Sequence, residues 1–389
     1  MAVKARLNTM VTKGATAIWY GLVLCMLLSA CETSHEEEPV SAFKQSEPIE
    51  VTELFRIGNE QDLLFQFGTT LVVDSAGRLF ISDPPFHLIR VFSASGDSLG
   101  VIGSEGEGPG EFRMISGIGM DHADSLYVWD FHLRRVTVFS PGLQPKASRT
   151  FRLKYRPESG IGDVLKPDTT GFVFLWASYP NQDWDKHLPL WLSWSDAQGN
   201  VVRDSILLIP PVQHLIERWE GGESMIRIPF ARHPIVRLGR DNRIYYGWTE
   251  NLEIEAYSLE GELLQTIRLP SRPIALTDAE LKEAIEELGG GRFGGRKVQA
   301  LKQIELPKTR PAFNDLVIGE GQMWIKVPDR LDSLSTWQVV DLSKQEVARC
   351  FLPEQLSIKV VRHGFLYAME RMGYDQYEVV VYRINDKDS

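Results

Sequence analysis

The feature that most constrains the fold of this chain is an internal repeat. Segments 71–92 and 117–139 follow the same plan: an apolar strand, a turn of the form Asp-x-x-Gly or Asp-x-x-Asp, an alternating strand, a short loop and a third alternating strand. Asp suits these turns because its side chain can cap the backbone, and Gly suits them because it accepts positive φ angles. The chain must therefore be explained as copies of one structural unit.

Four weaker copies of this unit follow. The second strands of the six copies are expected to begin at residues 79, 126, 172, 244, 323 and 365, which gives spacings of 47, 46, 72, 79 and 42 residues. A unit of roughly 40–45 residues with four strands is typical of a propeller blade. The two long spacings require insertions, which we expect at about 210–229 and 271–310.

The last copy shows only three strands, at about 357–361, 365–369 and 378–384. Segment 51–57 alternates and precedes the first copy, so we expect it to supply the missing fourth strand. Such pairing of the two chain ends would close the ring and remove an open sheet edge. The sequence thus predicts an all-β fold: a six-bladed β-propeller over 51–386, with a short helical insertion between blades four and five.

The connector between the first two copies, Gly-Ser-Glu-Gly-Glu-Gly-Pro-Gly-Glu-Phe at 103–112, supports this interpretation. Together with the blade cores over 70–140, it resembles the six-bladed propellers with NHL-type repeats, in particular the propeller lipoproteins of Bacteroidota. The resemblance implies a propeller of the cell envelope. Some NHL-type propellers are lyases with His or metal at the axis, so the resemblance leaves an enzyme open.

The first thirty residues are expected to be a lipoprotein signal peptide. Lys4, Arg6 and Lys13 precede an apolar run of 16 residues at 15–30, which is shorter than the roughly 20 residues that span a bilayer as a helix. The run ends in Leu-Ser-Ala followed by Cys31, which resembles the lipobox of bacterial lipoproteins. That resemblance implies cleavage before Cys31 and lipidation of its thiol. The alternative is an ordinary signal peptide with a chance Cys.

Charge and cysteine content then indicate the environment of the mature chain. Removal of residues 1–30 takes the formal net charge from −10 to −13, which argues against a nucleic-acid partner. Cys350 is the one thiol left, so no intramolecular disulfide is expected. Residues 31–50 are expected to form an acidic tether. The acidic residues of this tether resemble the surface-export signal of Bacteroidota lipoproteins. The alternative is that they form a merely acidic spacer. We expect lipid anchoring in the cell envelope, at the outer membrane or cell surface.

The second insertion is expected to contain a helix. Thr277 and Glu280 form a capping-box pattern, Leu281, Ile285 and Leu288 make an apolar stripe, and Gly289 ends it. Glycines at 289–295 predict a hinge, so the helix is either a lid or a permanently packed plug. In a propeller, the loops between strands two and three and the inter-blade connectors share one face, called the top face below. We expect the two insertions to contact each other there and partly cover the axis.

Three clusters are candidate sites on the top face. The first, in blades one and two, could bind a divalent cation or act as an acid/base pair; in the alternative, Arg90, Arg134 and Arg135 pair with its carboxylates and the Asp residues hold their own loops. The second is the aromatic loop of blade three, which could stack on a saccharide. The third could bind an anion unless its cations pair with carboxylates. The first cluster comprises Asp83, His87, Glu105, Glu107, Asp130 and His132. The second comprises Trp184 and His187, and the third comprises Arg232 and His233, with Arg227 and Arg237 nearby.

Three other tryptophans near the aromatic loop, Trp176, Trp191 and Trp194, are expected to pack between blades. No Gly-x-Ser-x-Gly, His-Glu-x-x-His or P-loop pattern occurs in the sequence. We therefore expect a ligand-binding or protein-assembly module with a protein or saccharide ligand and no cofactor, although a divalent cation stays open. The alternatives are a lyase or hydrolase with a His or metal site at the axis, and a structural envelope lipoprotein.

Overall fold

A computed structural model describes residues 43–58, 65, 69–143, 145–150, 159–165, 171–178, 190–220, 222–290, 294–330, 333–373 and 376–385. The signal segment, Cys31, Trp184 and His187 lie outside these described residues. Within them, no helix is long and apolar enough to cross a membrane.

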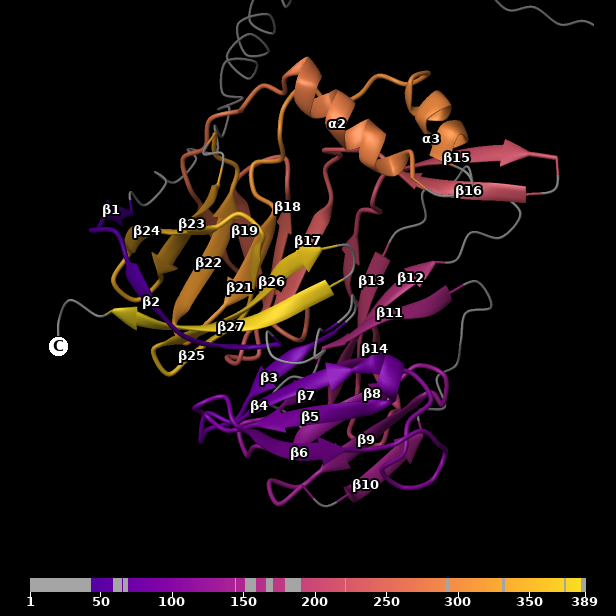
Figure 1. The fold of residues 1–389 in the computed structure, drawn as a ribbon, viewed down its shortest axis with the longest axis vertical. Helices are drawn as coiled ribbons and strands as arrows, with labels where there is room; N and C mark the ends of the chain where they lie inside the picture. Colours follow the sequence, from indigo (N-terminus) through magenta and orange to yellow (C-terminus); the bar gives the residue numbers. More distant parts are fainter. Residues whose placement is uncertain are drawn as a thin grey trace, which may run out of the picture. The chain divides into compact units, whose positions relative to one another are not determined.

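The described residues form an all-β, six-bladed propeller, as the repeat predicts (Figure 1). Each of the first three blades is a four-stranded antiparallel sheet whose strands follow one another in the chain. Blade one comprises β3 (Leu71–Val73), β4 (Leu79–Asp83), β5 (Leu88–Phe92) and β6 (Ser98–Ile102). Blade two comprises β7 (Ile115–Met120), β8 (Leu126–Asp130), β9 (Arg135–Phe139) and β10 (Pro145–Thr150). Blade three comprises β11 (Ser159–Leu165), β12 (Phe172–Ser178), β13 (Leu190–Ser195) and β14 (Val201–Ile209).

The last three blades repeat this plan, with additions from the N-terminal segment. Blade four comprises β17 (Pro234–Leu238), β18 (Ile244–Trp248), β19 (Glu253–Tyr257) and β20 (Leu263–Arg268). Blade five comprises β21 (Asp315–Ile318), β22 (Gln322–Val327), β23 (Leu334–Asp341), β24 (Glu346–Pro353) and the added β1 (Lys44–Gln45). Blade six comprises β25 (Leu356–Arg362), β26 (Phe365–Gly373), β27 (Gln376–Asn385) and β2 (Glu50–Ile57).

Strand β2 closes the ring in the predicted manner. It pairs antiparallel with β27, from Glu50 opposite Asn385 to Ile57 opposite Val379. The expected tether over 31–50 needs a correction at its C-terminal end, because β1 pairs in parallel with β24 and Ile49 packs against the core between blades five and six. The propeller therefore begins near residue 43 rather than at 51.

Turn chemistry fixes the hairpins as the sequence indicates. In blade one, Asp74 Oδ1 accepts the backbone N–H groups of Ala76 and Arg78 at 3.0 and 2.8 Å, and Gly77 takes a φ of +79°. Asp124 occupies the matching position in blade two at φ 57°, which Asp tolerates better than most residues. Both turns lie at the face opposite the top face.

The core is divided among the six blade interfaces, and each interface has its own hydrophobic cluster. Between blades two and three, for example, Trp129, Phe174 and Trp176 pack together. The innermost strands contact one another around the axis, in the pairs β17–β21, β21–β25, β25–β3, β3–β7 and β7–β11. The blades therefore form a rigid support for the loops at their ends.

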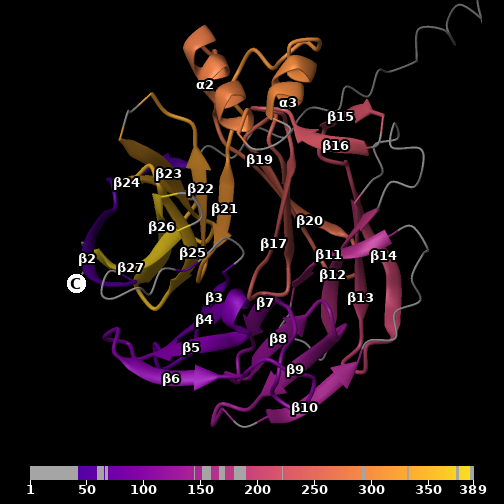
Figure 2. The same cartoon turned by 45° about the vertical axis from the view of Figure 1, so that its right-hand side comes forward.

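Both insertions form structure of their own on the top face (Figures 1 and 2). The first is a two-stranded hairpin, β15 (His214–Trp219) with β16 (Gly222–Arg227). The second contains α2 (Asp278–Leu288), whose capping box between Thr277 and Glu280 is present as predicted. It also contains α3 (Gly294–Leu301). This second helix is a correction, because the expected glycine hinge over 289–295 supplies the first two residues of α3.

The two insertions contact each other, as expected. Ile226 of β16 packs with Ala300 and Leu301 of α3, and Ile285 and Leu288 of α2 border this cluster. Arg296 of α3 lies 5.3 Å over the ring of Trp219. Helix α2 itself has no fully buried side chain, so it is attached to the propeller along one edge only.

Candidate functional site

The two aspartates of the predicted acidic cluster serve their own loops. Asp83 is buried, and its Oδ2 accepts Arg90 Nε at 2.7 Å, which is the expected pairing. Asp130 is fully buried, and it accepts the backbone N–H groups of Arg113 at 2.7 Å and Leu133 at 2.8 Å. Arg135 was an expected partner of this cluster, but it donates to backbone carbonyls of the preceding connector instead.

The remaining members of this cluster do not converge. Glu105 and Glu107 are exposed and pair with Arg113, at 2.9 and 3.5 Å. His87 takes a left-handed conformation, φ 57°, and ends the short 3-10 helix η1 (Pro84–Phe86). His132 is exposed. These contacts match the structural alternative for the cluster.

The expected packing of Trp176, Trp191 and Trp194 between blades is confirmed. Trp176 and Trp191 stack at 6.0 Å between ring centroids, within the cluster between blades two and three. Trp194 packs at the interface of blades three and four. Trp184 and His187 lie outside the described residues, so the proposed stacking loop stays a prediction.

The basic cluster separates into two parts. Arg232 is fixed in place by Glu250 at 2.9 Å and by the carbonyl and hydroxyl of Thr309 at 3.0 and 2.7 Å. It therefore joins the start of blade four to the connector before blade five. His233 and Arg227, in contrast, line a pocket under α2.

That pocket is part of a larger depression, which we call the top groove. It consists of three adjoining pockets of about 530, 430 and 840 Å³. Glu354 borders all three pockets, and Glu283 and Glu287 of α2 border the first and third. The other wall is formed where the innermost strands of blades four to six begin, because His233, Asn314 and Leu356 line it. Helix α2 therefore lies over the axial ends of these strands, as the sequence predicts.

One end of the groove is fixed by a network around Glu280. Its carboxylate accepts the backbone N–H of Thr277 at 2.7 Å and the Arg310 Nε at 2.9 Å. The Thr277 hydroxyl and backbone, and then Arg310, lower the pKa of Glu280 to about 2. The network ties the N-terminus of α2 to the connector before blade five.

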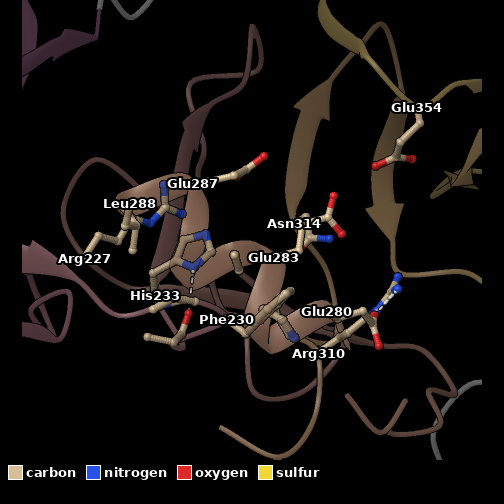
Figure 3. Close-up of a pocket in the computed structure, with 14 residues that line it drawn as sticks. Arg227, Phe230, His233, Glu280, Glu283, Glu287, Leu288, Arg310, Asn314 and Glu354 are labelled. Atoms are coloured by element: carbon tan, nitrogen blue, oxygen red, sulfur yellow. Dashed lines mark hydrogen bonds and ion pairs between the residues drawn. The ribbon is translucent and has the colours of Figure 1, made fainter. Parts of the chain in front are cut away.

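The other end of the groove carries His233 and Arg227 (Figure 3). The His233 Nδ1 lies 3.3 Å from the Ala231 carbonyl, so this nitrogen carries the proton if the contact is a hydrogen bond. Burial lowers the pKa of His233, which keeps the imidazole neutral at pH 7. Figure 3 shows Glu287 of α2 at this same end, beside Leu288 and Arg227, with the Glu280–Arg310 pair at the opposite end of the helix.

Charges of both signs in the groove are left without ion-pair partners. Among the described residues this holds for Glu283 and Glu287 on α2 and for Arg227 on β16, all of them exposed. Lys326 and Glu354 pair with each other across the floor at 3.3 Å. Glu283 and Glu287 were not predicted as site residues. The sequence feature that points to these two glutamates is the polar face of the expected helix, and every amphipathic helix has such a face.

In the part of the chain that the structure describes, no three His, Cys, Asp or Glu side chains are arranged to hold a metal ion. Whether a divalent cation binds elsewhere stays an open prediction.

Comparisons with known proteins agree with this architecture. The DUF5128 family, described as a 6-bladed beta-propeller, matches residues 35–186. No curated protein matches the sequence. A Bacteroides fragilis protein described as exported is similar over 88% of this chain and 99% of its own, with a TM-score of 0.51 and 10% identity. A DUF4221 member from Bacteroides vulgatus is similar over 88% of this chain and 100% of its own, with a TM-score of 0.52 and 12% identity. The chain is a six-bladed β-propeller.

Proposed function

We propose that this protein is a lipid-anchored, extracytoplasmic propeller whose top groove binds a polypeptide segment of a partner protein. The observation that carries the proposal is the set of unpaired charges in the groove, with Glu283 and Glu287 on one wall and Arg227 at one end. Charges that no internal partner neutralises are available to a ligand with complementary charges.

A polypeptide fits this groove better than a saccharide does. A neutral sugar is held mainly by aromatic stacking and neutral hydrogen bonds, whereas the groove presents charged groups, with Phe230 and Tyr377 as its aromatic side chains. A peptide can place a basic side chain near Glu283 and Glu287 and an acidic one near Arg227. The rigid blades keep these groups fixed, which limits the entropy that is lost on binding.

Selection from a displayed library of random twelve-residue peptides tests the proposal. The full chain should enrich peptides with basic residues, and these peptides should lose most of their binding to a Glu283→Gln/Glu287→Gln variant. Glu286→Gln is the matched control, because Glu286 pairs with Lys282 on the same helix and lines none of the three pockets. Enrichment that is equal in all three proteins would refute the groove as a peptide site, and binding to a panel of neutral glycans instead would favour the saccharide.

Two observations support the location. The sequence places Cys31 at the end of a signal-like run, and a structural neighbour from Bacteroides fragilis is described as exported. Cys31→Ser should abolish lipidation, and the variant should lose its partition into the detergent phase of a Triton X-114 separation. If the variant partitions as the wild type does, the lipid anchor is refuted.

His233 favours a second candidate function, a hydrolase or lyase with its site in the top groove. With Nδ1 toward the Ala231 carbonyl, a neutral imidazole leaves Nε2 able to accept a proton. The probe is p-nitrophenyl acetate, whose ester bond is cleaved by water that a general base activates. Release of nitrophenolate should be lost in His233→Gln and kept in His132→Gln. Equal rates in both variants and in protein-free buffer would refute this candidate.

A further inference from the structure

An innermost strand of the propeller carries a lysine that forms no ion pair with any residue the structure describes. Lys359 lies on β25, the innermost strand of blade six, in the bulge between Ile358 and Val360. Its side chain is solvent-exposed, although β25 contacts the innermost strands of both neighbouring blades, β3 and β21. Solvent therefore enters the axis at this level. We call the space bounded by the innermost strands the axial channel.

Two charged side chains from other innermost strands act on Lys359 in this channel, Arg237 of β17 and Asp315 of β21. The Arg237 Nη2 donates to Asp315 Oδ1 at 2.8 Å. Asp315 is thus engaged by Arg237, while Lys359 forms no ion pair with any described residue. Two cations and one carboxylate give this level of the channel a net positive charge.

Within the described residues, Lys359 and Arg237 also keep N–H groups that make no hydrogen bond. The Lys359 ammonium has three donors and uses one on Ser357 Oγ, at 3.0 Å. The Arg237 Nη1 and Nη2 donate to the Val236 carbonyl and to Asp315, and each nitrogen keeps a second N–H. Charged donors in a partly desolvated site form strong bonds to oxyanions.

The electrostatics of the axis agree with an anion there. Although solvent reaches Lys359, the surrounding strands remove much of its hydration and lower its pKa; Asp315 opposes this effect and Arg237 adds to it. Further along β25, the buried Arg362 is already compensated, because its Nε lies 3.7 Å from the Glu320 carboxylate. Lys359 is therefore the cation of β25 that forms no ion pair with a described residue, in a chain whose formal net charge is −10.

We propose that the axial channel binds a small oxyanion, a phosphate or a carboxylate, between Lys359, Ser357 and Arg237. Ser357 also lines the top groove, so the channel opens into it and the anion enters from the top face. This site goes beyond the proposed peptide groove and does not depend on it, because its donors lie on the innermost strands and not on α2.

Isothermal titration calorimetry of the full chain in detergent micelles tests the site, with inorganic phosphate and, separately, acetate as probes. Lys359→Met should weaken phosphate binding by about tenfold or more, because it removes the unpaired charged donor. Asp315→Asn should strengthen binding severalfold, because it removes the carboxylate that competes for Arg237. Lys344→Met is the matched control, since Lys344 lies in an exposed turn beside Asp341, and it should bind as the wild type does.

The gain expected for Asp315→Asn keeps the proposal testable even if Lys359→Met folds poorly. Competitive acetylation of Lys359 gives a second measurement, because a bound anion favours the charged ammonium and should raise the pKa of Lys359. The site is overturned if wild type and Lys359→Met bind phosphate equally, or if Asp315→Asn brings no gain. Loss of phosphate binding in Arg227→Gln would place the anion in the groove and would also overturn it.

Discussion

Strand β2 and the helical insertion are both additions to the regular blade pattern, yet they are attached in opposite ways. The eight residues of β2 pair with β27 along the strand, and Ile57 is buried in the cluster between blades six and one. Helix α2 has eleven residues and none of them is fully buried. It is held by the edge of one small cluster and by the Glu280–Arg310 pair.

The difference shows that the length of a segment does not determine its structural importance in this molecule. A short strand from the far end of the chain completes a sheet and removes its open edge. A long insertion adds little buried surface, so its side chains can serve the groove without weakening the blades. Stability is therefore expected to depend on β2, and binding on α2.

Deletion of residues 47–58 should have the largest effect. It removes the outer strand of blade six and exposes β27, so we expect aggregation and a melting temperature lower by about 10 °C or more, from a loss of several kcal/mol. Differential scanning calorimetry and size-exclusion chromatography measure both effects. Deletion of residues 43–46 is the control, because it removes only the two-residue strand β1. A monomeric 47–58 deletion variant with an unchanged melting temperature would contradict the closed ring.

A cluster of charged side chains around Arg56 of β2 tests the comparison between β2 and α2 further. Arg56 pairs with Glu370 and with the almost completely buried Glu378, at 3.3 Å from the latter. Arg56→Met leaves a buried carboxylate without its partner, which should lower the free energy of unfolding by about 3 kcal/mol. Urea unfolding measures this loss, and Glu378→Gln added to Arg56→Met should restore part of it.

The exposed pair of Arg268 and Glu253 provides a matched contrast at 2.8 Å. Arg268→Met should change the free energy of unfolding by less than about 1 kcal/mol, because exposed pairs contribute little. Equal losses in Arg56→Met and Arg268→Met would show that burial of the β2 cluster is unimportant.

The sequence predicted the blades well because their signals are local. Strands β4, β8, β12, β18 and β26 begin at the predicted residues, and β22 begins one residue earlier. Alternation and turn residues lie within each hairpin, so they can be recognised without knowing the partner strands. Strand β1 and helix α3 were missed, because each is stabilised by contacts with distant segments. The hairpin β15–β16 was also missed although its pairing is local, and its Ile226 packs against α3 rather than within a blade.

The candidate sites were harder to predict, because residue type does not show what a side chain contacts. Asp130 and Glu283 are both acidic residues near the top face, yet Asp130 is fully buried on backbone N–H groups and Glu283 is exposed in the groove. Lys359 looks in the sequence like any polar residue in an alternating strand. Its place in the axis follows from the packing of the innermost strands around it, which the sequence does not encode locally.

Replacement of residues 277–296 by a short Gly-Ser loop should have a much smaller effect than loss of β2. Changes in surface loops cost little closure entropy, and α2 contributes no fully buried side chain. We expect the melting temperature to fall by no more than about 3 °C, with wild-type circular dichroism in the β region. A fall as large as that of the 47–58 deletion would show that the insertion belongs to the structural core.

The smallest expected effect is a pH dependence of α2 itself. The Thr277 hydroxyl and backbone and the Arg310 guanidinium lower the pKa of Glu280 from 4.5 to about 2. The unfolded segment lacks the capping box and the Arg310 pair and therefore binds a proton more readily than folded α2, so the helix has its full stability above pH 4.5 and loses it as the pH falls toward 2. Hydrogen-exchange protection of the α2 amides, taken relative to those of β22, should fall between pH 5.5 and pH 3. In Glu280→Gln this relative protection should already be low at pH 5.5 and change little, whereas Glu286→Gln should respond to pH as the wild type does. If the protection of α2 in Glu280→Gln still fell with pH as in the wild type, the pH dependence of α2 would have to come from other groups.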